Sequence, residues 1–177
     1  MLLNDSDPTL GFHGMSEAQS STSRWDVVPQ GIFSRHYDLR RDGEAMASLK
    51  MQLWTEGCEF TIAGHRFSIR RTSLWKDGFQ LLAGPSSVCD VKRGFWSRRF
   101  ELEAVEEKWF LQPAGWFTRT YQLVSGNRVV GSIRHTGLFT RSRVGEFAES
   151  VPPPVQMFAI FLVLVVSRRQ QRRSSTG

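Results

Sequence analysis

Apolar and polar residues alternate with a period of two along much of the chain after residue 24. The clearest run has an apolar face made by Ala45, Ala47, Leu49, Met51 and Leu53, and its intervening residues include Ser48, Lys50 and Gln52. Successive side chains of a β-strand point to opposite faces, so this run predicts a strand with one buried side. Residues 66–70 and 99–104 show the same alternation, with charged residues on the other face.

Turn-forming residues divide this region into short segments. Gly supplies the positive φ that tight turns need, and Asn and Asp tolerate it. The predicted breaks are Asp42-Gly43, Ala63-Gly64, Asp77-Gly78, Gly84-Pro85, Arg93-Gly94, Pro113-Ala114-Gly115, Gly126-Asn127 and Gly137. About a dozen short strands fit between them, and closely spaced hairpins favour a barrel or a sandwich.

The pattern changes after Val151-Pro152-Pro153-Pro154, where a continuous apolar run reaches Val166 and ends in Ser167-Arg168-Arg169. Pro is tolerated in the first helical turn and Arg is favourable in the last. A helix without a polar side must be buried all round. We therefore predict an all-β fold with one helix, a closed antiparallel barrel of about twelve strands that encloses a hydrophobic C-terminal α-helix at 154–167. Its predicted core residues are Met157, Phe158, Ile160, Phe161, Leu162, Leu164 and Val165.

A membrane anchor is the alternative interpretation of this segment. Its uninterrupted apolar part, Met157 to Val166, would be about 15 Å long as a helix, half of the roughly 30 Å hydrocarbon core. The length favours a buried helix and predicts no transmembrane span.

The ends of the chain differ in composition from the barrel region at 25–169. Residues 1–24 are small and polar without a period, which predicts a disordered segment, and 170–177 predict a flexible basic tail. The start of the chain has no basic, apolar pattern of a secretory signal, so we expect a cytoplasmic protein, peripheral at the membrane if it binds lipid.

The charge is mostly arginine and is concentrated near the C-terminus. The formal net charge is +6, with 23 Lys+Arg against 17 Asp+Glu, and four of these charges belong to Arg168, Arg169, Arg172 and Arg173. Without those four the net charge is 6 − 4 = +2, so nucleic acid is not the expected partner. Cys58 and Cys89 fit no zinc or disulfide framework, and we expect no metal and no cofactor.

No motif for catalysis stands out. Glu101 and Glu103 share one strand face, but such carboxylates commonly form a solvated face paired with Arg and Lys. His65 and His135 lie near Gly turns and read as turn or strand-end residues. We therefore expect a protein that is not an enzyme.

Arginine doublets are the best candidates for ligand binding. One residue of each doublet would enter the apolar interior unless the doublet lies at a strand end. If several ends converge on one rim, a guanidinium cluster suited to anionic head groups results. Its candidate residues are Arg40, Arg41, Arg70, Arg71, Arg98, Arg99, Arg141 and Arg143. The alternative is cross-strand pairing with acidic residues.

Several stretches resemble the strand motifs of small bacterial members of the tubby C-terminal-like superfamily, which includes the LURP-one-related proteins and the phospholipid scramblases. The matching stretches are Asp38-Leu39-Arg40-Arg41-Asp42-Gly43, Glu59-Phe60-Thr61-Ile62-Ala63-Gly64, Arg99-Phe100-Glu101-Leu102, Arg119-Thr120-Tyr121-Gln122-Leu123, Val130-Gly131-Ser132-Ile133 and Pro154-Val155-Gln156 before the Phe-rich run.

The resemblance covers roughly residues 25–169 and implies a twelve-stranded barrel filled by the C-terminal helix. Tubby-type members bind phosphoinositides and scramblases act at membranes with calcium, but this chain has no acidic loop with calcium-ligand spacing and no matching lysine-rich motif.

The resemblance and the doublets together predict a monomeric, non-catalytic binding module that docks on anionic phospholipid head groups. The alternative is a scaffold that binds a protein partner through aromatic residues such as Trp54 or Trp116.

Overall fold

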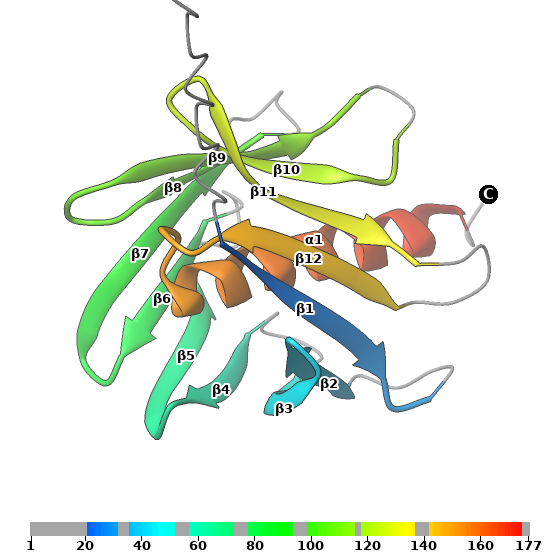
Figure 1. Cartoon of the computed structure of the whole chain (residues 1–177), viewed down its shortest axis with the longest axis horizontal. Helices are drawn as coiled ribbons and strands as arrows, with labels where there is room; N and C mark the ends of the chain where they lie inside the picture. The colour runs from blue at the N-terminus through cyan, green and yellow to red at the C-terminus, as the bar shows by residue number, and fades with distance from the viewer. Residues whose placement is uncertain are drawn as a thin grey trace, which may run out of the picture.

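The computed structural model describes residues 21–31, 36–51, 57–72, 78–93, 99–115, 118–136 and 142–174. These residues form twelve strands and one helix (Figure 1). The elements are β1 (Thr22–Pro29), β2 (His36–Arg41), β3 (Glu44–Lys50), β4 (Cys58–Ile62), β5 (His65–Arg71), β6 (Phe79–Ala83), β7 (Ser86–Arg93), β8 (Phe100–Glu103), β9 (Lys108–Pro113), β10 (Tyr121–Ser125), β11 (Arg128–His135), β12 (Arg143–Ala148) and α1 (Pro153–Ser174).

All strand pairs are antiparallel and belong to one sheet of order β3-β2-β1-β12-β11-β10-β9-β8-β7-β6-β5-β4. The sheet curls so that β3 and β4, its two ends, come near each other around the helix (Figure 1). No hydrogen-bonded ladder joins β3 to β4 within the described residues, so the barrel is nearly closed. The prediction of a twelve-stranded barrel around a C-terminal helix is thereby confirmed.

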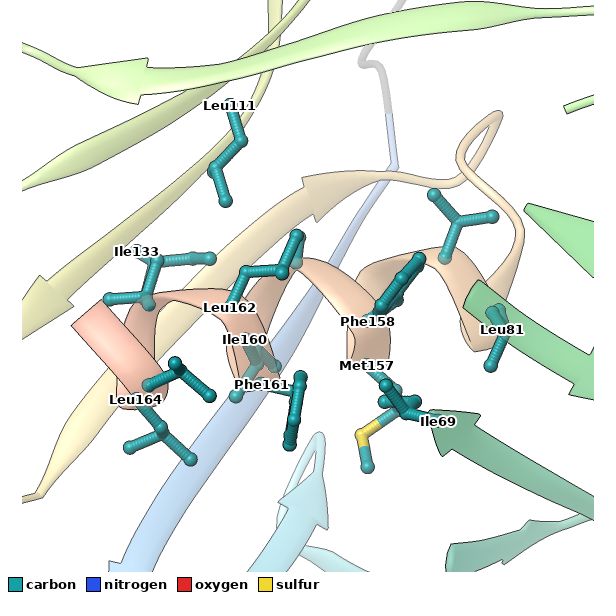
Figure 2. Close-up of a cluster of buried hydrophobic side chains, with 14 of the residues drawn as sticks. Ile69, Leu81, Leu111, Ile133, Met157, Phe158, Ile160, Phe161, Leu162 and Leu164 are labelled. Atoms are coloured by element: carbon teal, nitrogen blue, oxygen red, sulfur yellow. The ribbon is translucent and has the colours of Figure 1, made fainter. Parts of the chain in front are cut away.

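Helix α1 fills the barrel. Every residue from Val155 to Val166 is buried, including all seven predicted core residues. Figure 2 shows the side chains of Ile69 (β5), Leu81 (β6), Leu111 (β9) and Ile133 (β11) pointing at the helix. Phe161 packs edge-on against Phe79 of β6, with ring centroids 5.6 Å apart. In the described part of the chain, no helix combines the length and the apolar character needed to cross a bilayer.

Small residues let the strands approach the helix where β11 and β12 cross it. A Cβ on Gly145 would lie 2.8 Å from Phe147 Cε2 and 3.5 Å from Ile160 Cδ1. A Cβ on Gly131 would overlap the same Phe147 ring. These glycines therefore make room for the Phe147 ring beneath the sheet.

Two predicted boundaries were wrong. Strand β1 begins at Thr22 rather than after residue 24, because Ser23 is buried and continues the ladder with β12. The helix, predicted at 154–167, begins at Pro153 and continues to Ser174, so most of the predicted tail is helical. Arg and Gln favour helices, and cations near the C-terminus interact well with the helix dipole, which explains the extension.

The predicted apolar face at 45–53 is only partly correct. Leu49 and Met51 are buried and Ala47 is half-buried, but Ala45 is exposed. In the ladder with β2, Leu39 pairs with Ala47 and Arg40 pairs with Ala45, so Met46 forms a bulge in β3. The bulge turns the start of β3 outward. Leu53 lies outside the described residues.

Two hairpins use type I′ turns, in which both central residues have positive φ. Asp42 and Gly43 have φ of 50° and 90°, and Ala63 and Gly64 have φ of 49° and 79°. Asp42 suits this conformation and also accepts a hydrogen bond from the Arg24 backbone N–H at 2.8 Å. Ala63 has no such compensation, since a Cβ makes the left-handed region unfavourable by roughly 1–2 kcal/mol.

Replacing Ala63 with Asn should therefore stabilise the protein by about 0.5–1 kcal/mol, because Asn tolerates the left-handed conformation better. Thermal denaturation of the full chain measures the effect. The converse change, Asp42→Ala, should lower the melting temperature. A melting temperature that falls in Ala63→Asn would contradict the turn geometry.

Candidate functional site

The two ends of the barrel are built differently. At one end the strands are joined by short turns, and β12 leads into α1 there. The other end has the six odd-to-even connections, from β1–β2 to β11–β12, and the last turns of α1 also lie at this end, at the right of Figure 1. We call the strand ends, the adjoining described residues and the last helical turns at this second end the cationic rim.

The name reflects how charge is divided between the ends. Within the described residues, the terminal strand residues at the cationic rim and the residues beyond them include no Asp or Glu, whereas their basic residues include Lys50, Arg71, Arg99, Arg119, Arg143, Arg168, Arg169 and Arg172. One residue further into the strands, Arg70, Lys92 and Arg134 are accompanied by Glu59 and Glu101. The opposite end has acidic residues beside its cations, namely Asp42, Glu44, Glu103, Glu106, Glu107 and Glu149. The field of the barrel is therefore positive at the helix C-terminal end.

The structure separates the predicted arginines into two groups. Arg70, Arg71, Arg99 and Arg143 lie at the cationic rim. The doublet Arg40-Arg41 ends β2 and lies at the opposite end, so the candidate residues do not all belong to one rim. Arg98 and Arg141 lie outside the described residues, as do Trp54 and Trp116.

The doublets Arg40-Arg41 and Arg70-Arg71 lie at strand ends, as predicted. Arg40 and Arg70 are exposed, while Arg41 and Arg71 are half-buried. Arg41 forms an ion pair with Asp42 at 3.7 Å. Arg99 stacks on the Phe110 ring, with its guanidinium carbon 3.5 Å from the ring centroid, which is a cation–π contact on the outer face.

Arg143 is the most deeply buried of these arginines. It shares the inward face of β12 with Gly145 and Phe147 and is only 3% exposed. Its Nε and Nη1 have no hydrogen-bond partner among the described residues. Burial lowers the pKa of this guanidinium to about 10, while Tyr37 and Tyr121 act in the opposite direction. The group therefore remains cationic at neutral pH.

A pocket of about 250 Å³ opens at the cationic rim between the end of α1 and strands β9 to β11. We call it the mouth pocket. Its polar lining residues are Thr118, Arg119, Tyr121, His135, Ser167, Gln170 and Gln171. No acidic side chain occurs among the described residues that line it. His135 is also the ladder partner of Arg143, but Arg143 is not itself among the residues that line the pocket.

The carboxylates that could have suggested acid–base catalysis belong to a solvated face. Lys108 Nζ lies 2.6 Å from Glu101 Oε1, and Lys92 Nζ lies 3.2 Å from Glu103 Oε2. The hydrogen bond from Lys108 lowers the pKa of Glu101, so this carboxyl is held ionised. Such a group is a poor general acid at neutral pH.

The two cysteines are buried, and the described histidines belong to no group suited to a metal ion. Cys58 and Cys89 are free and buried, and burial raises the pKa of both thiols, that of Cys89 to about 12. Protonated thiols are weak nucleophiles. No group of His, Cys, Asp and Glu suited to a metal ion occurs among the described residues.

Comparisons with protein-family models, with curated proteins and with solved structures found no match to this chain. The resemblance to the tubby C-terminal-like superfamily therefore stays a prediction. The arguments about function rest on the geometry of the cationic rim and the mouth pocket.

Two parts of this site were missed by sequence reasoning. The burial of Arg143 has a signal in the alternation of Arg143, Gly145 and Phe147, which places all three on one face of a strand. Gln170 and Gln171 had no signal, because the segment was predicted to be a tail. They reach the pocket only because α1 is longer than its apolar run.

Proposed function

We propose that this chain is a non-catalytic binding module that docks reversibly on anionic phospholipid surfaces through its cationic rim. The observation that carries the proposal is the division of charge: at the terminal strand residues and beyond them, the described part of the rim contains cations and no carboxylate, whereas the opposite end contains both. Basic residues near an anionic leaflet contribute about 1 kcal/mol each to binding.

A regularity in the sequence of the connections supports a membrane as the partner. All six connections between strands at the rim include two adjacent large apolar residues: Ile32-Phe33, Leu53-Trp54, Leu74-Trp75, Phe95-Trp96, Trp116-Phe117 and Leu138-Phe139. These pairs lie outside the described residues, and only the strand ends that flank them are placed. Trp in particular favours the membrane–water interface, and basic residues beside apolar ones are typical of interfacial binding.

The test compares charge reversal at the two ends of the barrel. Lys50 and Arg70 are exposed at the rim, and Arg40 and Arg128 are exposed at the opposite end. The pairs Lys50→Glu/Arg70→Glu and Arg40→Glu/Arg128→Glu change the net charge equally. Only the rim pair should weaken sedimentation with phosphatidylserine-containing vesicles, by at least about tenfold.

Vesicle composition and salt complete the experiment. Wild-type protein should sediment with anionic vesicles, less with neutral ones, and should be released by high salt because screening weakens exposed charges. Equal losses in the two variant pairs would mean that net charge rather than the rim drives binding. No sedimentation of the wild type with either vesicle would reject the proposal and favour a protein partner.

A further inference from the structure

Residues 1–20 carry a charge opposite in sign to that of the cationic rim. Their charged side chains are Asp5, Asp7 and Glu17, and the first basic residue of the chain is Arg24. Because the whole chain has a formal net charge of +6, the residues after 20 carry 6 + 3 = +9. We call residues 1–20, which lie outside the described residues, the acidic segment. Its charge is complementary to that of the rim.

The rim is the part of the described barrel where positive charge is least compensated. Lys50, Arg70 and Arg119 are exposed there and form no ion pair with another described residue. On the outer face of the sheet, cations instead meet carboxylates of neighbouring strands, as in the pairs Arg134–Glu146, Arg66–Glu59 and Lys108–Glu101. The opposite end of the barrel has its own acidic residues. An acidic peptide is therefore attracted to the rim rather than to the sides of the barrel.

The acidic segment is long enough to reach the rim. It joins the barrel at the opposite end, because β1 begins at Thr22, which pairs with Ala148. Strand β1 has eight residues between that end and the rim, a distance of about 26 Å at the usual rise of a strand. Twenty extended residues span up to about 66 Å. The tether also keeps the segment at a high effective concentration near the rim, which favours contacts that are individually weak.

We propose that the acidic segment binds the cationic rim of its own chain and competes there with anionic phospholipids. Carboxylates and phosphate groups form charge-assisted hydrogen bonds with the same guanidinium groups, so both cannot occupy one arginine. Exposed ion pairs are weak, so the segment should lower the affinity for membranes without abolishing it. This inference rests on the docking function proposed above, because it assigns a regulator to the same surface.

Carbodiimide cross-linking tests the contact without any membrane. The reagent joins a lysine amine directly to a neighbouring carboxylate, and the two ends of the barrel each offer an exposed lysine: Lys50 at the rim and Lys108 at the opposite end. In the full chain at low salt, a carboxylate of the acidic segment should become linked to Lys50. Lys108 should become linked to Glu101, whose Oε1 lies 2.6 Å from its Nζ, and this product is the positive control. Peptide mass spectrometry of the monomer band identifies both products.

The pattern of links decides between the possible occupants of the rim. Formation of the Lys108–Glu101 product without a link from the acidic segment to Lys50 would overturn the proposal. Equal links from the segment to Lys50 and to Lys108 would also overturn it, because the segment would then have no preference for the rim. Links to Lys50 found only in a dimer band would mean that the segment of a second copy binds there.

Vesicle sedimentation tests the competition with two matched triple variants. Asp5→Asn/Asp7→Asn/Glu17→Gln neutralises the acidic segment, and Glu106→Gln/Glu107→Gln/Glu149→Gln removes the same charge from exposed positions at the opposite end. Only the first should bind phosphatidylserine-containing vesicles more tightly than the wild type, by about threefold to tenfold at low salt. High salt should remove this gain, because it screens exposed charges.

The two experiments separate failure of this inference from failure of the docking function. Equal gains in the two triple variants would mean that net charge, rather than the acidic segment, controls membrane binding, and would overturn the competition. Sedimentation of the wild type without a link to Lys50 would keep the docking function and reject the acidic segment as its regulator. If none of the three proteins sediments with vesicles, the docking function and the competition are both rejected, whereas a link to Lys50 would still support binding of the segment to the rim.

Discussion

Deleting residues 152–177 should leave a chain that no longer unfolds cooperatively. The deletion removes the twelve buried residues from Val155 to Val166, and their strand partners around the barrel lose their packing. Burying a large apolar side chain contributes about 1.5–3 kcal/mol, and native domains are stable by only about 5–15 kcal/mol in total. The inner faces of the strands would then line an empty, apolar space.

Far-UV and near-UV circular dichroism during heating, with analytical ultracentrifugation for solubility, measure this result. Truncation after Arg169 is the control, since it keeps the whole apolar run and should retain a sharp transition. A milder variant, Phe161→Ala, should lower the free energy of unfolding by about 3–5 kcal/mol, and it should still fold if the wild type is more stable than that. A cooperative transition in the 152–177 deletion would show that the strands form a core without the helix.

The helix and the strands were predictable because the physical signals are long and redundant. The apolar run near the C-terminus is too short to cross a bilayer, and it follows prolines and ends in arginines. This combination predicts a buried helix. Boundaries were less predictable, since they depend on single tertiary contacts. Thr22 and Ser23 have no apolar pattern, and their place in β1 follows from the ladder with β12 and from the hydrogen bond of Ser23 to Gln156.

The position of the arginines depends on the parity of the strands. In an up-and-down barrel, the C-terminal ends of even-numbered and odd-numbered strands lie at opposite ends. Arg40-Arg41 ends β2 and Arg70-Arg71 ends β5, so the two doublets cannot share a rim. Each doublet was recognisable locally, but assigning it to an end requires a correct count of all preceding strands.

The strand order also explains where the pairs of large apolar residues between the strands occur, which the sequence alone does not show. Read one by one, pairs such as Leu74-Trp75 and Phe95-Trp96 are ordinary apolar residues between strands. Only the topology shows that every such pair belongs to a connection at the cationic rim. The opposite end, with type I′ turns at residues 42–43 and 63–64, uses short connections that serve the fold. Loops on a rigid scaffold commonly carry function, and this division fits that rule.

Replacing Gln156 with Ala should destabilise the protein by about 3–5 kcal/mol, because Gln156 is fully buried and connects the start of α1 to β1 and to the segment between β12 and α1. Its Oε1 accepts hydrogen bonds from Ser23 Oγ at 3.0 Å and from Trp25 Nε1 at 2.6 Å. Its Nε2 donates to the Val151 carbonyl at 2.7 Å. Chemical denaturation of the variant and the wild type measures the loss.

The variant Gln156→Glu separates the hydrogen bonds that Gln156 accepts from the one that it donates. A glutamate keeps the acceptor for Ser23 and Trp25, but an ionised carboxylate cannot donate to the Val151 carbonyl, whereas a protonated one can. The folded state should therefore raise the pKa of the new carboxyl above its unfolded value of about 4.3. Stability relative to the wild type should then be highest below about pH 4 and should fall as the pH rises above that value. A difference from the wild type that stays constant between pH 4 and pH 8 would mean that the Val151 bond contributes little. The helix would then be held in register by the acceptor bonds to β1 alone.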